Sequence, residues 1–279
     1  MKPYFIGLGA QKCGTSWIYA NLDTHPEIHI PIKEIHFFSR EYHFSKGIIW
    51  YEAFYKRCGK TQKCGEFCTS YLFSEMAAER IFHFYPEIKL IATLRNPVDR
   101  AFSNFKNDVM AGNVNKGVGF FNALDDHPEY IEQGQYSDQL ERFLKYFSMK
   151  NMCVMIYEDI KKNPQLFMKK IYAFLDVRDN FTSRLLHEKI NPSYVPRSQV
   201  LERVMSKVSS KLKHLKGGNI FKSLKRVGIN KVIRGMNRND RDNVPVLKHD
   251  ERKKLFQYFG DSIIKLEKLL EREIPEWKI

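Results

Sequence analysis

The sequence contains no long apolar run. No stretch of about 18 consecutive apolar residues occurs along its 279 positions, which excludes a transmembrane helix on sequence grounds. The apolar stretch after Met1 is too short for a signal peptide, and no small-residue cleavage site follows it. These absences predict a cytoplasmic protein.

Glycine, proline and cysteine are also scarce. The chain holds 15 Gly and 11 Pro beside 43% hydrophobic and 14% aromatic residues, which excludes disordered, collagen-like and low-complexity chains. A disulfide framework is not expected from an odd, scattered set of cysteines: Cys13, Cys58, Cys64, Cys68 and Cys153. Three of them lie within eleven positions but lack the paired Cys-x2-Cys spacing of zinc sites. We therefore expect reduced structural thiols and no bound metal.

Acidic residues are outnumbered by basic ones. The chain has 46 Lys and Arg against 32 Asp and Glu, a formal net charge of +14. Residues 201–242 carry twelve Lys or Arg and three acids, a net of +9. Such a balance indicates an anionic partner, which the charge alone leaves open among nucleic acid, membrane headgroups and a small phosphorylated ligand.

Apolar runs alternate with amphipathic stretches over the first 175 residues, a pattern typical of an α/β fold with a central parallel sheet flanked by helices. The pattern predicts strands over 4–8, 88–94 and 152–156, and helices over 15–22, 47–55, 74–84, 97–110, 137–147 and 164–175. We expect one domain over residues 1–279. It would comprise a core of about 1–199, a basic, mostly helical segment of about 200–243 and a closing helix of about 250–271.

The first chemical motif follows the first predicted strand and opens a helix. It comprises residues 9–17, with the sequence GAQKCGTSW. A tight loop at a helix N-terminus directs backbone N–H groups toward a phosphate or sulfate. Lys12 precedes Gly14, so the Gly-Lys-Ser/Thr ending of nucleotide triphosphatases is missing. The motif predicts an anion site without a metal; the alternative is a glycine turn with an exposed lysine.

The second motif leaves the strongest predicted strand and enters a helix. It comprises residues 94–103, in which Asn96 suits the helix N-cap and Pro97 the first helical position. Arg95 then lies at the carboxyl end of a strand, and Ser103 follows two turns into the helix. A guanidinium and a hydroxyl together suit a phosphate monoester. The alternative is that Arg95 pairs with Asp99.

These two motifs, in this order, resemble the sulfotransferase family, whose donor is 3′-phosphoadenosine 5′-phosphosulfate (PAPS). Residues 12–17 resemble the family's 5′-phosphosulfate loop, and Arg95 with Ser103 resembles its 3′-phosphate site. Residues 33–38 (KEIHFF) are similar to the segment that carries the catalytic base in heparan sulfate type enzymes. Other similar segments are 65–66, 70–71, Tyr136 with Leu140, 157–160 and 191–198, so the resemblance extends over nearly the whole chain.

The resemblance implies a P-loop-like sulfotransferase fold and in-line transfer of a sulfonate group to a hydroxyl or amine. Lys12 would stabilise the leaving phosphate and Glu34 would act as general base. His36 would help or replace Glu34, because the two side chains share a direction if the segment is extended; the alternative is a core histidine. The implied donor-binding residues are Gln11, Lys12, Cys13, Gly14, Thr15, Ser16, Trp17, Arg95, Ser103, Arg197 and Ser198.

Two positions depart from the heparan-type pattern. Phe67 stands where those enzymes place a lysine after the acid of the second strand, which leaves a second cationic contact in question. No cysteine follows Cys153, so the C-terminal disulfide of those enzymes is missing. Arg197 and Ser198 are the expected C-terminal donor contacts, with Lys216 and Gly217 behind them.

The expected acceptor is a small molecule, either a natural product or a glycan-like metabolite, in a bacterial cytoplasm; a polysaccharide is the alternative. The expected donor is PAPS, no metal is required and the oligomeric state is open. A nucleic-acid binder is not expected, because aromatic residues are not interleaved with the lysines of 201–242. A magnesium-dependent kinase and an inactive relative are the remaining alternatives, and intact Lys12, Glu34, Arg95 and Ser103 argue against the latter.

Overall fold

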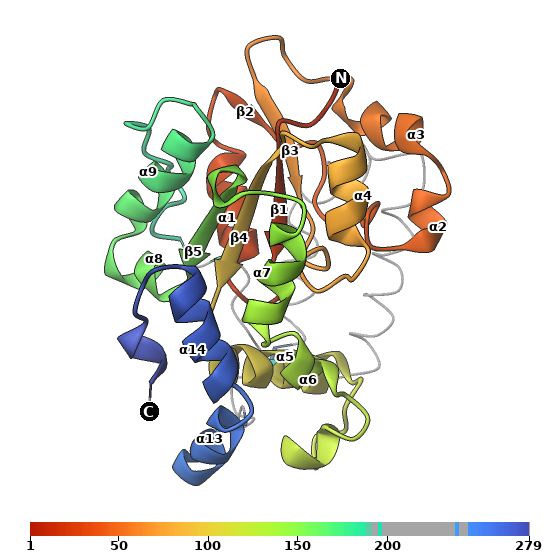
Figure 1. Ribbon diagram of the computed structural model, residues 1–279. Coiled ribbons are helices and arrows are strands. Elements are labelled where there is room, and N and C mark those ends of the chain that lie inside the picture. Colours follow the sequence, from red (N-terminus) through yellow and green to blue (C-terminus); the bar gives the residue numbers. More distant parts are fainter. Residues whose placement is uncertain (189, 191–194, 197–237, 240–244, 279) are drawn as a thin grey trace. The chain divides into compact units, whose positions relative to one another are not determined.

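The computed structural model describes residues 1–188, 190, 195–196, 238–239 and 245–278 (Figure 1). The chain divides into two compact units, each described here by itself. The first comprises residues 1–101, 131–191 and 250–279, and the second comprises 102–130 and 192–249. The first unit contains the sheet and most of the predicted site.

Five parallel strands form the sheet in the order β2-β3-β1-β4-β5. Their bounds are Phe5–Gly9 (β1), Ile28–His29 (β2), Lys63–Phe67 (β3), Lys89–Leu94 (β4) and Met152–Ile156 (β5). β1 lies at the centre, where Phe5 pairs with Gly65 of β3 on one side and with Lys89 of β4 on the other. The predicted parallel sheet is confirmed, and its three predicted strands lie within one residue of the observed bounds.

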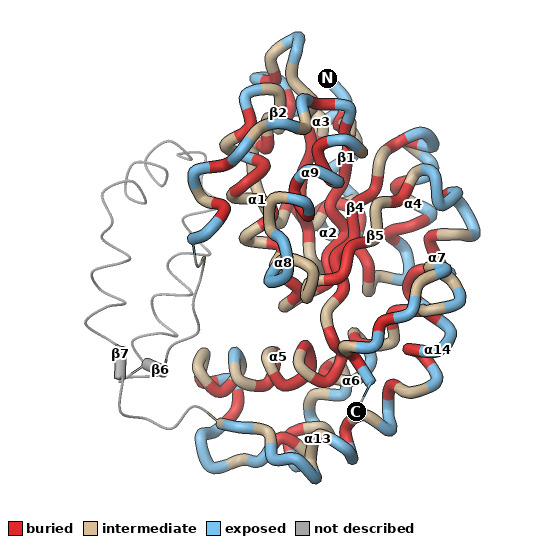
Figure 2. Tube along the Cα trace, turned by 90° about the vertical axis from the view of Figure 1, so that its left-hand side faces the viewer, coloured by how far each residue is buried: buried red, intermediate tan, exposed pale blue. Residues whose placement is uncertain are grey.

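Helices cover both faces of this sheet, so β1 is buried along its whole length (Figure 2). One face packs against α1 (Thr15–Leu22) and α9 (Pro164–Phe174) through a core that includes Phe5, Ile18, Ile91 and Ile171. The other face carries α4 (Ala77–Phe84) and α7 (Tyr136–Leu144) (Figure 1). Because all five strands are parallel, their carboxyl ends lie at one edge of the sheet, where sheets of this kind bind their ligands.

The described ranges contain further helices. They are α2 (Glu41–Phe44), α3 (Ile48–Glu52), α5 (Pro97–Ala111), α6 (Glu129–Glu132), α8 (Glu158–Lys162), α13 (His249–Phe256) and α14 (Gly260–Leu269), with short 3-10 turns at Ala53–Tyr55, Phe121–Ala123, Met149–Asn151 and Pro275–Trp277. None of the helices in the described ranges has the length and apolar character that a bilayer span requires.

The prediction of one closing helix over 250–271 is wrong, because α13 and α14 are separate. The backbone tightens between them: Tyr258 N–H donates to Leu255 and Phe259 N–H donates to Phe256 at 2.9 Å. This turn carries Phe259 into the interior, where it is fully buried beside Gly134. The break between the two helices therefore allows the Phe259 ring to be buried.

The prediction that all cysteines are reduced is wrong for Cys58 and Cys64, which form a disulfide. A turn in which Gln62 N–H donates to the Gly59 carbonyl folds the chain back before β3. The two Cα atoms are thereby 6.3 Å apart, within the range of disulfides. Cys13, Cys68 and Cys153 are free thiols, and their pKa values are raised because they are buried.

The second unit has its own aromatic core. Phe105 contacts Phe102, Phe120 and Tyr130 with ring centroids 5.5 to 6.3 Å apart, and Tyr130 donates its hydroxyl to Asp108. Strands β6 (Val195–Pro196) and β7 (Arg238–Asn239) pair antiparallel. The predicted basic, mostly helical segment of about 200–243 lies outside the described residues, apart from Arg238 and Asn239.

Candidate active site

The loop from β1 to α1 has the backbone geometry of an anion cradle. Gly14 is the N-cap of α1 and has φ of 79°, and Lys12 has φ of 67°. The carbonyl of Gly14 accepts from Trp17 and Ile18, so the N–H groups of Thr15 and Ser16 precede the first bonds of the helix. Glycine has no side chain to cap these donors, which leaves them available to an anionic ligand.

Gly14 is required here for a second reason. A Cβ atom at this position would lie 2.8 Å from the ring of Tyr157, which follows β5. Tyr157 also lies near the guanidinium of Arg95, which is 5.1 Å from its ring centroid. One tyrosine ring therefore contacts both predicted donor-binding motifs. The sequence does not reveal this link, because Tyr157 belongs to neither motif and lies far from both along the chain.

Arg95 lies at the carboxyl end of β4, as predicted. Its Nη1 donates to the carbonyl of Lys12 at 3.4 Å, which joins the two motifs through the backbone of the first loop. Its Nε is buried and has no hydrogen-bond partner among the described residues. The alternative pairing of Arg95 with Asp99 is wrong, because Asp99 forms its ion pair with Arg252. Arg95 is thus oriented by the loop and retains an unsatisfied donor.

The predicted helix cap after Arg95 is confirmed. The side-chain oxygen of Asn96 accepts from the N–H groups of Val98 and Asp99 at 3.0 and 3.4 Å. The backbone N–H of Asn96 donates to Glu158, whose other oxygen accepts from the indole of Trp277. Ser103 lies two turns into α5 and is half-buried, in the part of that helix that belongs to the second unit.

Two residues of the predicted donor loop have side chains that serve the core. Cys13 is fully buried, with its sulfur 3.6 Å from the hydroxyl of Tyr136, and burial raises the pKa of its thiol to about 11. Trp17 packs edge-on against Phe167 of α9 at 6.1 Å. These two positions therefore offer a ligand their backbone rather than their side chains. Arg197 and Ser198 lie outside the described residues.

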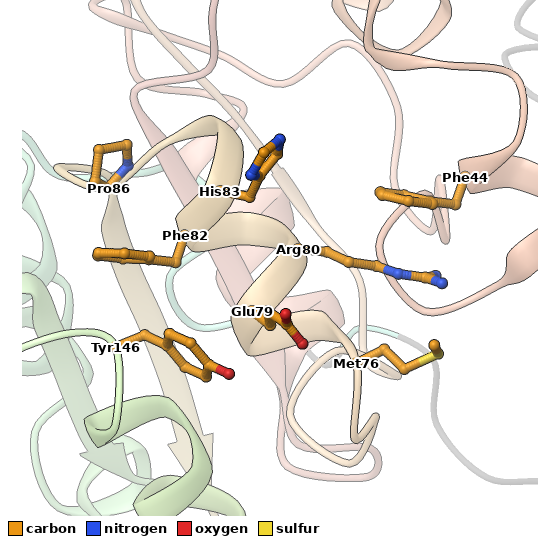
Figure 3. A pocket seen from close by; sticks show the side chains of 8 residues that line it. All are labelled: Phe44, Met76, Glu79, Arg80, Phe82, His83, Pro86 and Tyr146. Atoms are coloured by element: carbon orange, nitrogen blue, oxygen red, sulfur yellow. The ribbon is translucent and has the colours of Figure 1, made fainter.

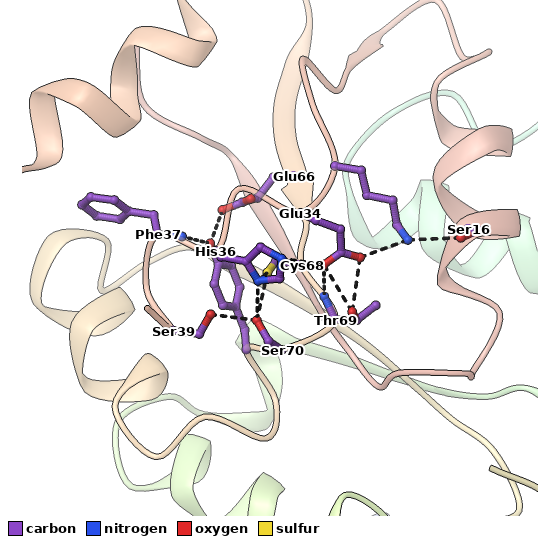
Figure 4. A network of polar contacts seen from close by, with 11 residues as sticks. Ser16, Glu34, His36, Phe37, Ser39, Glu66, Cys68, Thr69 and Ser70 are labelled. Atoms are coloured by element: carbon purple, nitrogen blue, oxygen red, sulfur yellow. Dashed lines mark hydrogen bonds and ion pairs between the residues drawn. The ribbon is translucent and has the colours of Figure 1, made fainter. Parts of the chain in front are cut away.

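Glu34 is held at the carboxyl end of β3. Its backbone N–H donates to the carbonyl of Phe67 at 2.8 Å. Its carboxylate accepts the N–H of Thr69 at 3.0 Å and the Thr69 hydroxyl at 3.2 Å (Figure 4). The ammonium of Lys33 lies 3.1 Å from the same carboxylate and 3.1 Å from the hydroxyl of Ser16 in α1. Lys33 thus links the predicted base to the end of the anion loop, where α1 begins.

His36 lies beside Glu34, but not for the predicted reason. Glu34 and His36 both have left-handed backbones, with φ of 64° and 59°, so the segment is not extended. Their side chains meet nevertheless, with Nε2 of His36 3.8 Å from Oε2 of Glu34. The other ring nitrogen of His36 lies 2.9 Å from the hydroxyl of Ser70, which contacts Ser39 (Figure 4). Left-handed backbone in residues other than glycine is costly and is often found at functional sites.

The buried carboxyl group of Glu66 stabilises the segment that contains Glu34 and His36. Glu66 of β3 is fully buried and accepts the hydroxyls of Tyr51 and Tyr71 at 2.7 and 2.9 Å. Desolvation raises the pKa of Glu66 to about 7, although the two tyrosine hydrogen bonds oppose the shift. The hydroxyl of Tyr71 also accepts the backbone N–H of Phe37. The cluster therefore fixes the chain immediately after His36, and its polar role is not visible in the sequence pattern.

Three groups at this site have the chemistry of metal ligands. One ligand atom from each of Glu34, His36 and Cys68 lies within 4.8 Å of the others. Glu34 already accepts from Thr69 and pairs with Lys33. These contacts fit a positioned carboxylate better than a metal ligand.

A separate groove of about 780 Å³ runs along α4 (Figure 3). It is lined by Phe44, Met76, Glu79, Arg80, Phe82, His83, Pro86 and Tyr146. None of these residues belongs to the anion loop or to the cluster around Glu34. The groove therefore does not contribute to the candidate active site.

Together, the fold and the site define an α/β protein with a backbone cradle of the kind that suits an anionic ligand at the edge of a parallel sheet, and with a carboxylate held beside it. Residues 3–224 match the family model described as Sulfotransferase domain. The chain belongs to the sulfotransferase family.

Similar proteins agree with this assignment. Mouse heparan sulfate glucosamine 3-O-sulfotransferase 3B1 is 29% identical over 192 residues, which cover 65% of this chain and 48% of that protein. Human bifunctional heparan sulfate N-deacetylase/N-sulfotransferase 2 is 29% identical over 206 residues, 66% of this chain and 23% of that protein. The chain spans about half the length, or less, of these curated relatives.

Solved structures show the same fold. A sulfotransferase from Alicyclobacillus acidocaldarius superposes with a TM-score of 0.70 and 24% identity, covering 100% of both chains. Mouse sulfotransferase SULT7A1 complexed with PAP superposes with a TM-score of 0.51 and 17% identity, covering 94% of this chain and 84% of that chain. The P-loop-like sulfotransferase fold expected from the resemblance is confirmed.

Proposed function

We propose that this chain transfers a sulfonate group from PAPS to a hydroxyl or amine of a glycan-like acceptor by in-line displacement. The observation that carries the proposal is the position of the Glu34 carboxylate. It is linked through the Lys33 ammonium to Ser16, at the start of the helix that follows the anion loop. A general base beside an anion cradle is the arrangement that such a transfer requires.

The residues of the site fit this donor. The N–H groups of Thr15 and Ser16 at the start of α1 suit the 5′-phosphosulfate. The buried Nε of Arg95 lacks a partner among the described residues, and a phosphate oxygen would satisfy it. Arg95 is therefore proposed to hold the 3′-phosphate, with Ser103, Arg197 and Ser198 as further donor contacts. Bound PAPS supplies an activated sulfonate group.

The reaction requires a proton acceptor and stabilisation of the leaving group. Glu34 accepts the proton that the acceptor hydroxyl or amine loses as its bond to sulfur forms. Lys12 and the N–H groups of Thr15 and Ser16 stabilise the negative charge that develops on the leaving phosphate oxygen. His36 contacts Glu34 and orients it. None of these roles uses a metal ion, so we propose a metal-independent reaction.

The proposed acceptor class rests on charge and on the relatives. Two matched relatives are named for heparan sulfate, one for 3-O-sulfation of its glucosamine. Residues 201–242 of this chain carry a net +9, which suits an anionic glycan. A small natural product in a bacterial cytoplasm is the alternative acceptor, and nucleic acid is not proposed as a physiological partner.

Two measurements test the proposal. The nucleotide product, adenosine 3′,5′-bisphosphate (PAP), should raise the melting temperature of the protein, because ligands of the folded state stabilise it. Labelled PAPS should then transfer its sulfonate to a member of an acceptor panel that contains heparan-type oligosaccharides, neutral sugars and phenolic natural products. Absence of both PAP binding and transfer would contradict the proposal. Transfer only to phenols would retain the activity and replace the acceptor class.

A further inference from the structure

Lys33 occupies a position between two functional groups. Its ammonium lies 3.1 Å from the hydroxyl of Ser16, the second residue of α1, and 3.1 Å from Oε1 of Glu34. These groups come from separate parts of the chain, the start of α1 and the segment that follows β2. The ammonium therefore lies where the anion loop and the carboxylate approach each other.

The surroundings of Lys33 strengthen its electrostatic effect. The side chain is 21% exposed, so it is largely withdrawn from water, where charge interactions are stronger than at an open surface. An ammonium has three N–H donors, and the contacts with Ser16 and Glu34 use two of them. A third donor is left for an oxygen of a ligand bound in the same place.

In β3, the residue that follows the buried Glu66 carries no positive charge. Phe67 follows Glu66 in β3, is 1% exposed and packs its ring against Phe5 at 6.2 Å. A Cβ atom at Gly7 would meet the same ring, so the aromatic side chain is built into the sheet. A positive charge at this side of the site must therefore come from another element, and Lys33 provides one.

We propose, on the basis of the sulfotransferase function proposed above, that Lys33 is a catalytic residue that binds the sulfonate group of PAPS during transfer. Its ammonium donates to a sulfonate oxygen while it remains between Ser16 and Glu34. The acceptor then approaches the sulfur from the side of Glu34. This assignment gives the reaction two cations, Lys12 at the leaving phosphate and Lys33 at the group that moves.

The atoms of the step balance without a further reactant. The bond between sulfur and the bridging phosphate oxygen breaks, and its electron pair remains on that oxygen in PAP. A new bond forms between sulfur and the acceptor oxygen or nitrogen, and the acceptor proton passes to Glu34. Lys33 stays protonated throughout and contributes only charge and hydrogen bonding.

Binding of PAPS and PAP without acceptor separates the role of Lys33 from that of the loop. PAP lacks the sulfonate, so Lys33→Met should leave PAP affinity unchanged and weaken PAPS affinity by about tenfold, the value of one charge-assisted hydrogen bond. Turnover with PAPS should fall by about a hundredfold, as expected for loss of one preorganised charge. Lys33→Arg should restore part of both losses.

Two comparisons make the test specific. Lys145→Met, at an exposed position of the first unit, should behave as the wild type in all measurements. Lys33→Met introduced into a Glu34→Gln background should weaken PAPS binding by the same factor, because the contact with the sulfonate does not act through Glu34.

Two results would overturn the inference. Equal weakening of PAP and PAPS binding would show that Lys33 only shapes the loop, and unchanged binding with turnover within about twofold of the wild type would show that it is not used. A wild-type protein that binds neither nucleotide would instead contradict the proposed function, so the two failures are distinguishable.

Discussion

Thr69 holds the carboxylate of Glu34 with both of its donors. The backbone N–H reaches Oε2 at 3.0 Å, and the hydroxyl lies 3.2 Å from each oxygen. Thr69 follows β3 by two residues, and β3 pairs with β1, which leads into the anion loop. The position of the proposed base is therefore coupled to the sheet, although its own backbone is left-handed.

Glu34→Gln tests the assignment of the general base. The amide retains an oxygen for the Thr69 N–H but cannot take a proton, so turnover should fall by about 10² to 10⁴ while PAP affinity is retained. Measurement of PAP release in a single turnover checks this. The fraction of the protein that has PAPS bound is first set by titration. His36→Asn should cause a smaller loss. Full activity of the Gln variant would remove Glu34 from the role.

Arg95→Met tests recognition of the 3′-phosphate. Loss of hydrogen bonds to a charged group should weaken PAP binding by about 10-fold to 100-fold. Adenosine 5′-phosphate lacks the 3′-phosphate, so its affinity should change little. Calorimetric titration with both nucleotides measures the difference. The matched control is Arg252→Met, which breaks the ion pair with Asp99 and should leave PAP binding intact.

Gly14→Ala tests the close approach of Gly14 to the ring of Tyr157. The added Cβ meets both a left-handed backbone and an aromatic ring 2.8 Å away. Tyr157→Ala removes the ring and keeps the left-handed backbone cost of about 1–2 kcal/mol, so Gly14→Ala should destabilise the protein less in that background. Urea unfolding of the single and double variants measures both losses. Equal losses from Gly14→Ala with and without the Tyr157 ring would contradict the proposed contact.

Glu66→Gln tests the buried carboxyl through the pH dependence of stability. Between about pH 4.5 and 7 the folded protein keeps a proton that the unfolded chain has lost, so the free energy of unfolding falls as pH rises. The decline should be on the order of 3 kcal/mol and should be absent in the Gln variant, whose oxygen still accepts from Tyr51 and Tyr71. Denaturant unfolding across this pH range measures it. An unchanged slope in the variant would assign the effect to other groups.

Chelation tests the metal-independent reaction. Exhaustive dialysis against a chelator should leave turnover and PAP affinity unchanged, because charge on the leaving phosphate is stabilised by Lys12 and backbone N–H groups. A different result would assign a metal to Glu34, His36 and Cys68: activity is lost on chelation, zinc restores it, and zinc fails to restore it in Cys68→Ser.

Much of the fold follows from local patterns. The strands β1 and β4 are almost fully buried and β5 is partly buried, and all three are continuous apolar runs, which is why their positions could be predicted. β2 has two residues and is defined by its pairing with β3, so its own sequence gives no signal. The disulfide between Cys58 and Cys64 depends on a turn, and spacing alone does not reveal it.

The site was predictable in its residue types and less so in its geometry. Glu34 and His36 are predicted to lie together on an extended segment, but a left-handed backbone and contacts from Thr69 and Ser70, which follow β3, bring them together. The sequence shows Lys33 next to Glu34, but only the structure brings it to Ser16. Such contacts join positions far apart in the chain, which periodicity does not encode.

The central position of β1 has a consequence for redesign. The groups proposed to act on the acceptor follow β2 and β3 on one side of it, whereas Arg95 and Tyr157 follow β4 and β5 on the other. A library of substitutions restricted to residues 35–72 would vary the acceptor side and leave unchanged both the nucleotide side and Lys33, the proposed contact to the sulfonate of PAPS. The sheet order thereby separates most of the residues near the acceptor from those near the nucleotide, so acceptor specificity can be a target for directed evolution in its own right.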